Sequence, residues 1–140
     1  MPRSAAQVAC SAATALAAED SIAYAKEREA FGQPIGNFQV IQHWIADMQM
    51  KLMQCELLTY KSAWLKDHGR RMTLDSAMAK LYSSEIAVRI AEDCVQMHGG
   101  YGFVKDYPAE KYFRDVKLLT IGEGTSEIQR LVIARQLLAQ

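Results

Sequence analysis

Three short segments, rich in glycine and polar residues, carry the side chains that could do chemistry in this chain. They span residues 28–39, 96–103 and 114–127. Each segment by itself fits an ordinary helix end, because arginine suits the dipole at a helix C-terminus and glycine commonly ends a helix. A glycine-rich turn without a preceding strand is also a weak indication of nucleotide binding. The chemical meaning of these segments therefore depends on what they form together.

Glu123 is the residue with the clearest chemical potential. It lies between Gly122 and Gly124, so the backbone beside its carboxylate leaves room for a close approach. It also precedes an expected helix start, where the N–H groups of Gly124, Thr125 and Ser126 are free to bind an anion. A carboxylate base beside such amides suits proton abstraction from a carbonyl substrate that carries phosphates. An ordinary surface carboxylate before a helix cap is the alternative interpretation.

Long helical patterns fill the spaces between these segments. Main helices are expected over residues 4–29, 38–67, 74–98 and from 125 to the C-terminus, with a short helix over 109–117. Asn37, Thr73 and Thr125 are the expected N-caps, and paired glycines end the third helix. No strand-like alternation is present. The sequence therefore predicts one all-α domain over residues 1–140, an antiparallel four-helix bundle with a short extra helix.

The second predicted helix carries two apolar stripes instead of one. The first stripe consists of Phe38, Ile41, Ile45, Met48, Leu52, Cys55 and Thr59. The second stripe consists of Met50, Met53, Leu57, Tyr60 and Trp64. A small bundle covers one face of such a helix well, so we expect the other face to pack against another subunit or domain, in a homo-oligomeric dimer or tetramer. The third helix is expected to face inward through Leu74, Ala77, Leu81, Val88, Ala91 and Val95.

The composition is that of a soluble globular domain. The chain has 140 residues, of which 50% are hydrophobic and 23% charged. Its 16 basic residues balance 16 acidic ones, which disfavours nucleic acid and anionic membranes as partners. No apolar run approaches the roughly 20 residues of a membrane helix, and the cytoplasm is the expected location. Cys10, Cys55 and Cys94 share no metal-ligand spacing, so we expect no metal site and three buried thiols.

Taken in order, the three segments resemble the acyl-CoA dehydrogenases. The matching patterns are Tyr24…Arg28-x-x-Phe31-Gly32-x-Pro34…Phe38-Gln39, then Gln96-x-x-Gly99-Gly100-x-Gly102, then Tyr112-x-Arg114-Asp115…Glu123-Gly124-Thr125-Ser126-x-Ile128. They cover nearly the whole chain at the spacing of the family. The resemblance implies the C-terminal all-α domain of an enzyme that uses FAD to oxidise acyl-CoA thioesters to trans-2-enoyl-CoA.

The resemblance also implies a role for each matching residue. Glu123 falls at the position of the base that removes the α-proton, and Gly124 and Arg135 fall at positions that contact acyl-CoA. Some branches of the family carry the base at the start of the first helix of this domain, which aligns near Pro2 here and leaves Glu123 as the candidate. Arg28 matches the arginine that reaches the FAD pyrophosphate of a neighbouring subunit. The implied FAD-binding residues are Arg28, Phe31, Phe38, Gln39, Gln96, Gly99, Gly100, Thr125, Ser126 and Glu127.

The same resemblance implies that two further domains of the family, an N-terminal helical domain and a middle β-domain, are absent from this chain. Part of a contact set offsets the ordering of a bound cofactor poorly, so we expect weak or absent FAD binding by the chain alone. A partner chain that supplies the missing domains is an alternative to a homo-oligomer.

Two other functions stay open at the level of sequence. The first is a fragment of a related flavin enzyme, an acyl-CoA oxidase or flavin monooxygenase, which oxygen consumption would distinguish from a dehydrogenase. The second is a non-catalytic helical oligomerisation module, which would show no flavin absorbance.

Overall fold

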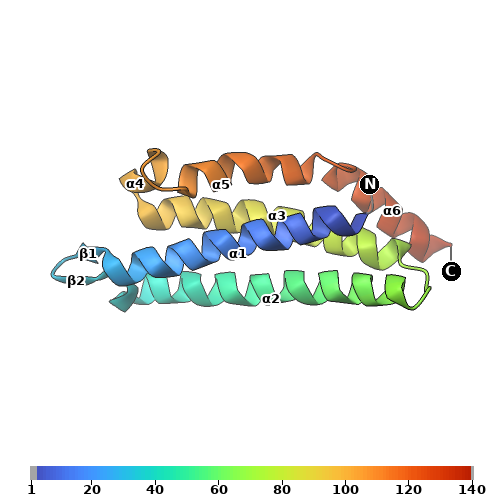
Figure 1. Ribbon diagram of the computed structural model, residues 1–140, viewed down its shortest axis with the longest axis horizontal. Coiled ribbons are helices and arrows are strands. Elements are labelled where there is room, and N and C mark those ends of the chain that lie inside the picture. Colours follow the sequence, from blue (N-terminus) through green and yellow to red (C-terminus); the bar gives the residue numbers. More distant parts are fainter. Residues whose placement is uncertain (1–2, 140) are drawn as a thin grey trace.

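Three long helices form the body of the molecule. The computed structural model describes residues 3–139. In it α2 (Gln39–Asp67) runs antiparallel to both α1 (Arg3–Glu27) and α3 (Thr73–His98), which run in the same direction (Figure 1). The fourth edge of the bundle is divided between two shorter helices, α5 (Ala109–Val116) and α6 (Ser126–Leu138), which both pack along α3. The prediction of an antiparallel all-α bundle is confirmed, with α5 as the short extra helix.

The buried face of α1 consists of small side chains. Cys10, Thr14, Ala17, Ser21 and Ala25 recur at steps of three or four residues and are all nearly inaccessible. The two hydroxyl groups on this face donate to backbone carbonyls one turn earlier, Thr14 to Cys10 and Ser21 to Ala17, each at 2.7 Å. Because these two hydroxyl groups are hydrogen-bonded and these five side chains are small, α1 can lie close against α3.

Helix α2 buries one of its two apolar stripes. Ile41, Met48, Leu52, Cys55 and Thr59 face the interior, as the periodicity predicts. The second stripe faces away from the bundle, and its members Met50, Met53, Leu57, Tyr60 and Trp64 are between 51% and 69% exposed. We call these five residues the outer stripe of α2. Within residues 3–139 nothing covers it.

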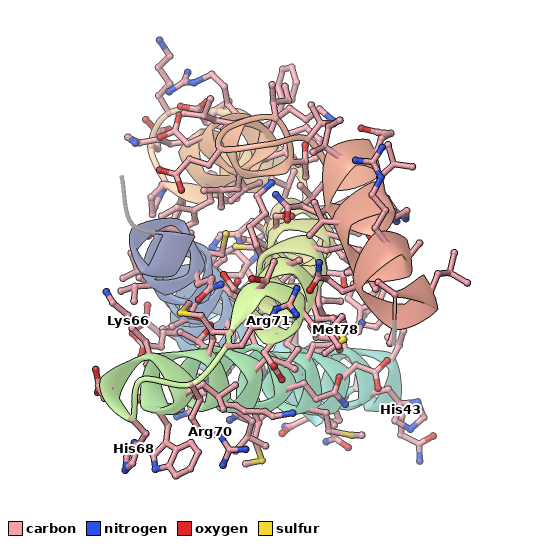
Figure 2. All side chains as sticks on the ribbon, turned by 90° about the vertical axis from the view of Figure 1, so that its right-hand side faces the viewer. His43, Lys66, His68, Arg70, Arg71 and Met78 are labelled. Carbon is pink, nitrogen blue, oxygen red and sulfur yellow. The ribbon has the colours of Figure 1, made fainter. Side chains whose placement is uncertain are left out.

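Helix α3 lies at the centre of the bundle, with α1, α2, α5 and α6 around it (Figure 2). Its predicted inner face is only partly right. Ala77 and Ala91 are fully buried, whereas the larger residues of that prediction, Leu74, Leu81, Val88 and Val95, are half-buried. Small and polar residues take the centre instead: Ser76, Ala77, Ala79, Lys80, Ser83, Ser84, Ala87, Ile90, Ala91, Cys94, Met97 and His98. A helix with neighbours on several sides has little room for long side chains.

Between α1 and α2 the chain forms a small hairpin that the sequence does not predict. The strands β1 (Glu29–Ala30) and β2 (Gln33–Pro34) pair antiparallel, and the 3-10 turn η1 (Ile35–Asn37) follows. Phe31 and Gly32 form the tip at φ +55° and +79°, the backbone of a tight two-residue hairpin loop. As expected, the chain leaves the helix at this segment. Strands of two residues each are too short to show the alternation of apolar and polar residues by which a strand is predicted.

Two of the three predicted caps are wrong. Asn37 belongs to η1, so α2 is capped one residue later, at Phe38, without a side-chain hydrogen bond. Thr73 is the first residue of α3, which Met72 precedes as the cap. Thr125 does cap α6, since its hydroxyl accepts from the Ile128 amide at 3.4 Å. Gly99, at φ +59°, ends α3 as predicted, and the one-turn helix α4 (Gly100–Phe103) begins immediately after it.

The thiols lie in the core, as the sequence predicts. Cys10, Cys55 and Cys94 are each 0% exposed. Burial raises the pKa of Cys10 and of Cys94 from 9.0 to about 11, because desolvation disfavours the thiolate. No helix within residues 3–139 is both long and apolar enough to cross a membrane.

The raised pKa of Cys94 predicts a loss of stability in alkali. The unfolded thiol ionises near 9.0 and the folded one near 11, so the contribution is complete below pH 9.0 and disappears as the pH rises toward 11. At 1.4 kcal/mol per pH unit, about 2 kcal/mol should be lost by about pH 10.5. Urea unfolding at about pH 8 and about pH 10.5 measures this loss, which should be smaller in Cys94→Ala. An equal loss in the variant and the parent would contradict the assignment.

Candidate functional site

The predicted site residues fall into two groups that lie at different places along the bundle. The first group surrounds the end of α1, the hairpin and the start of α4, and the second lies between α5 and α6 (Figure 1). Helix α3 relates the two groups, because His98 belongs to the first and Lys80 contacts the second. These residues are 18 positions apart, about 27 Å at about 1.5 Å per residue. The structure therefore assembles each group but does not bring them together.

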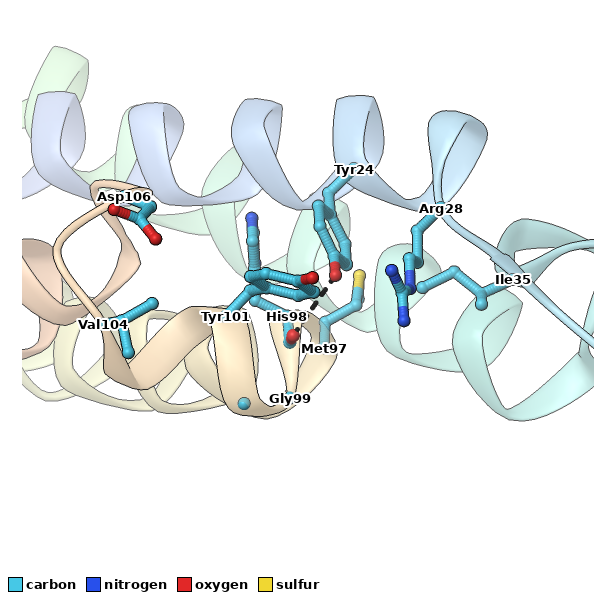
Figure 3. A pocket seen from close by; sticks show the side chains of 10 residues that line it. Tyr24, Arg28, Ile35, Met97, His98, Gly99, Tyr101, Val104 and Asp106 are labelled. Atoms are coloured by element: carbon cyan, nitrogen blue, oxygen red, sulfur yellow. Dashed lines mark hydrogen bonds between the residues drawn. The ribbon is translucent and has the colours of Figure 1, made fainter.

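An open cleft of about 630 Å³ occupies the first place. We call it the Arg28 cleft, and it is lined by Tyr24, Arg28, Ile35, Met97, His98, Gly99, Gly100, Tyr101, Val104 and Asp106 (Figure 3). Three of the predicted cofactor-binding residues, Arg28, Gly99 and Gly100, are thus neighbours. A β-carbon added to either glycine would meet no atom within 4 Å, so both glycines present bare backbone to open space.

Arg28 is held in place by its backbone and keeps its charge available. Its amide donates to the Tyr24 carbonyl and its carbonyl accepts from the Ile35 amide, both at 2.8 Å. The guanidinium carbon lies 5.3 Å from the centre of the Tyr101 ring, a cation–π contact. Arg28 pairs with no carboxylate within residues 3–139. A guanidinium without a counter-ion beside bare glycine backbone is suited to a phosphate group.

Aromatic rings form the wall behind Arg28. The ring of Tyr24 stacks on that of His98 with the centroids 4.1 Å apart, and Tyr107 meets Tyr24 edge-on at 5.5 Å. The Tyr24 hydroxyl donates to the His98 carbonyl at 3.3 Å (Figure 3), and Nδ1 of the buried His98 donates to the Cys94 carbonyl at 2.8 Å. Desolvation raises the pKa of Tyr24, which keeps its hydroxyl protonated as a donor. The wall is therefore rigid.

Sequence reasoning missed part of this cleft. His98 and Tyr101 flank the glycine pair that the motif includes, and Tyr24 is in the motif without an assigned contact. The sequence could have indicated that Tyr24 lines the cleft, since Tyr24 and Arg28 are one helical turn apart and therefore share a face. Four predicted residues, Phe31, Phe38, Gln39 and Gln96, do not line the cleft. Of these, Phe31 at the hairpin tip is 96% exposed, with its ring centroid 6.1 Å from that of Phe38.

The second group is built on a backbone in an unusual conformation. Glu123 has φ +54° and Gly124 has φ +96°, so two consecutive residues lie at positive φ. Non-glycine residues seldom adopt this conformation, because their β-carbon approaches the following carbonyl oxygen. The Gly124 carbonyl accepts from Lys80 Nζ at 2.7 Å. Gln129 Nε2 donates to the carbonyls of Glu123 and Gly124 at 3.2 and 3.4 Å. We call residues 122–125 the Glu123 loop.

The geometry of the loop leaves the Glu123 side chain outside. Glu123 is exposed, whereas both donors that hold its loop are buried, Lys80 at 3% exposure and Gln129 at 4%. Desolvation lowers the pKa of Lys80, and nearby carboxylates, Glu123 among them, act in the opposite direction. The loop carbonyls are therefore turned inward while the Glu123 side chain is exposed to solvent.

A cleft of about 330 Å³ lies beside the start of α6 and is lined by Glu85, Val88, Lys117, Thr120, Ile121, Thr125, Ser126 and Glu127. The buried hydroxyl of Ser126 has no hydrogen-bond partner within residues 3–139. The pKa of Glu127 is held low by its own amide at the helix start and by the Thr125 hydroxyl. Arg135 is exposed about 14 Å further along α6, at about 1.5 Å per residue, and does not line this cleft.

The order of these features along the chain corresponds to a known domain family. The family described as "Acyl-CoA dehydrogenase, C-terminal domain" matches residues 2–138. The chain belongs to this family. The family resemblance and the all-α fold inferred from the three motif segments are thereby confirmed, while the roles of individual residues remain predictions.

Individual acyl-CoA dehydrogenases and related reductases are similar over most of the chain. It is 56% identical over 122 residues to "Probable acyl-CoA dehydrogenase YngJ" of Bacillus subtilis, which covers 87% of this chain and 32% of that protein. It is 47% identical over 122 residues to "Caffeyl-CoA reductase-Etf complex subunit CarC" of Acetobacterium woodii, with the same coverage. The structure of butyryl-CoA dehydrogenase from Megasphaera elsdenii superposes with a TM-score of 0.95 at 37% identity, covering 97% of this chain and 36% of that one. The chain thus spans about a third of the length of the curated relatives it matches.

The conformation of Gly124 predicts a sharp difference between two glycine substitutions. In Gly124→Ala the new β-carbon would lie 2.8 Å from Gln129 Nε2 at a backbone φ of +96°. We expect a loss of about 1–3 kcal/mol in the free energy of unfolding, measured in urea. The control is Gly100→Ala, whose β-carbon meets nothing within 4 Å at the start of α4 and which should be neutral or slightly stabilising. Equal stabilities for the two variants would refute the strained conformation of the loop.

Proposed function

We propose that this chain is the FAD- and acyl-CoA-binding catalytic domain of an acyl-CoA dehydrogenase, in which Glu123 removes the α-proton of the thioester. The observation that carries the proposal is the Glu123 loop in a member of this family: an exposed carboxylate on a backbone at positive φ, held by two buried donors. Such an arrangement fixes a base with its carboxylate free, as general-base catalysis requires.

The proposed reaction requires one base from this chain. The Glu123 carboxylate takes the α-proton and becomes a neutral carboxylic acid. The electron pair of the broken Cα–H bond forms the double bond between Cα and Cβ. FAD, when bound, accepts the β-hydrogen with its electron pair as a hydride. The start of α6, with its free amides and the hydroxyl of Ser126, lies beside the base and is suited to polar groups of the cofactor or substrate.

The residues of the chain fit FAD at both places. Arg28, which pairs with no carboxylate within residues 3–139, lines the same cleft as the bare backbone of Gly99 and Gly100, which suits a pyrophosphate. At the other place, Ser126 has a buried hydroxyl without a partner in the described part of the chain. An orphaned buried donor is costly unless a ligand or water completes it, so its presence supports a bound polar group.

The distance between the two places supports binding of two different FAD molecules. The ribityl chain from the flavin ring to the first phosphorus atom has seven bonds and is at most about 10 Å long. His98, which lines the Arg28 cleft, and Lys80, which donates to the Glu123 loop, are about 27 Å apart along α3, at about 1.5 Å per residue. One FAD cannot place its pyrophosphate at Arg28 and its ring at Glu123. We therefore assign the Arg28 cleft to the FAD of a neighbouring subunit, and Phe31, Phe38, Gln39 and Gln96 to the surface around it.

The outer stripe of α2 supports a homo-oligomer. Five large apolar side chains in one row, each more than half exposed, are unusual for a surface that stays in water. The proposed assembly is a dimer or tetramer.

The reverse reaction is a second candidate, favoured by the similarity to the caffeyl-CoA reductase subunit. In that direction Glu123, as a carboxylic acid, would return a proton to the α-carbon. The two directions place the same demand on Glu123 and differ in which electron donor or acceptor the complete enzyme uses.

Replacement of Glu123 by Gln predicts loss of catalysis with retained binding. Gln keeps the size of the side chain and removes the basic oxygen, so anaerobic flavin bleaching by acyl-CoA should slow by about 10²–10⁴-fold in a complete enzyme containing this domain. Flavin content and acyl-CoA affinity should change far less. Glu92→Gln, at an exposed position of α3 far from the loop, is the matched control. Bleaching of Glu123→Gln within a few-fold of the parent rate would place the base elsewhere.

A charge on the outer stripe predicts a smaller assembly. Leu57 is 62% exposed, so Leu57→Glu should leave the fold of the chain intact while weakening association by at least about tenfold. Light scattering at micromolar concentration measures the change in mass. His43→Glu adds the same charge to an exposed position of α2 that precedes the stripe, about 21 Å from Leu57 at about 1.5 Å per residue, and should leave the mass unchanged (Figure 2). A monomeric parent, or an unchanged mass for Leu57→Glu, would contradict the proposed interface.

A further inference from the structure

We infer that Lys80 and Gln129 are positioning residues, which hold the Glu123 loop in the one backbone conformation that turns the Glu123 carboxylate outward. The inference rests on the proposed function of Glu123. The two residues come from different helices, Lys80 from the N-terminal third of α3 and Gln129 from the first turn of α6. Neither belongs to a motif by which the sequence resembles the family.

Together, the two side chains bind the carbonyl groups of Glu123 and Gly124 in the loop. Lys80 Nζ donates to the Gly124 carbonyl at 2.7 Å, a short, charge-assisted bond. Gln129 Nε2 bridges the carbonyls of Glu123 and Gly124 at 3.2 and 3.4 Å. Both carbonyl groups that follow a positive φ are therefore bound from the inner side. A peptide flip at either position would break these bonds.

The burial of Lys80 is the strongest sign of a specific role. Its side chain is 3% exposed, and a lysine is seldom buried without a charged partner. Within the described residues it makes no ion pair within 4 Å, and its ammonium donates to the Gly124 carbonyl. The groups whose charges act on it are Cys10 from α1, Glu85 from α3, and Glu123 and Glu127 from the loop and α6. A buried cation that is used to bind one loop carbonyl is costly for the fold, and a neutral residue would fill the same space at lower cost.

The conformation of Glu123 explains why such a holder is needed. A glutamate at φ +54° is strained, and strained residues persist only where their surroundings determine the backbone. The packing of α6 on α3 supplies these surroundings, and the ion pair between Arg130 and Glu85 at 2.6 Å joins the same two helices. The position of the proposed base thus depends on two donors that substrate does not touch.

The first test measures the backbone of the loop directly. Lys80→Met removes the ammonium but keeps an apolar side chain of similar length, and Gln129→Met does the same for the amide. In the parent chain, nuclear magnetic resonance should show the strong HN–Hα cross-relaxation of a positive φ at Glu123. We expect this signal to weaken in both variants, to be retained in Lys80→Arg, and to be unchanged in the control Lys66→Met on the exposed last turn of α2.

If Lys80→Met does not fold, as judged by its helical circular dichroism, Gln129→Met decides the test, because it removes only two longer hydrogen bonds. A positive φ at Glu123 in the folded variants that lack a donor would overturn the inference.

The second test measures catalysis in a complete holoenzyme containing this domain. A displacement of a catalytic group by about 1 Å can slow a reaction by about 100-fold, so Lys80→Met should slow flavin reduction by about 10- to 100-fold. The KM for acyl-CoA and the flavin content should stay within a few-fold, and Lys80→Arg should restore much of the rate.

The outcomes separate the inference from the proposed function. If Glu123→Gln is active while Lys80→Met still changes the loop, the proposed base is wrong and the positioning of the loop stands. If Glu123→Gln is inactive while Lys80→Met keeps both the rate and the loop conformation, Glu123 is the base and the inference about Lys80 is wrong.

Discussion

The close packing of four helices around α3 is the constraint on which the rest of the structure depends. A central helix can be approached from several sides only if its side chains are short, and α3 meets this demand with alanine and serine along most of its buried length. The face of α1 that packs against α3 is also formed mostly by small side chains. Most of the larger apolar side chains lie at the edges of the bundle and on α2, where the outer stripe is not covered by any of the described residues. The same constraint therefore produces the tight core and the exposed outer stripe.

The central helix also separates and connects the two candidate sites. His98 at the end of α3 contributes to the aromatic wall of the Arg28 cleft, and Lys80 in its N-terminal third donates a hydrogen bond to the Glu123 loop. A rigid helix keeps these places about 27 Å apart, at about 1.5 Å per residue, which exceeds the reach of one ribityl chain. Each place alone offers part of a site. Under the proposed function this division would link catalysis to assembly, since each FAD would be bound by residues of two copies of the chain.

The position of the Glu123 carboxylate, on which its proposed chemistry depends, is fixed through the backbone of the loop. The carboxylate itself is exposed and makes no hydrogen bond within the described residues, whereas the peptide groups on either side of it are held by buried donors. Because the loop backbone is held by buried donors and the carboxylate is exposed, a bound substrate could complete the environment of the proposed base. The Ser126 hydroxyl, which lies beside the same loop and has no hydrogen-bond partner among the described residues, is consistent with a site that a bound ligand completes.

Sequence alone determined what depends on local periodicity and on ordered motifs: the helices, both stripes of α2, the buried thiols, the Thr125 cap and the family. The tertiary structure decided what depends on how many neighbours a residue has. The helical pattern of α3 placed Ala77 and Ala91 correctly on its buried side, but it could not show that α3 contacts several helices, so most of its small buried residues were not predicted. In sequence Lys80 resembles any surface lysine, because its partner Gly124 is 44 residues away. The separation of the two sites and the positive φ of Glu123 likewise follow from long-range packing.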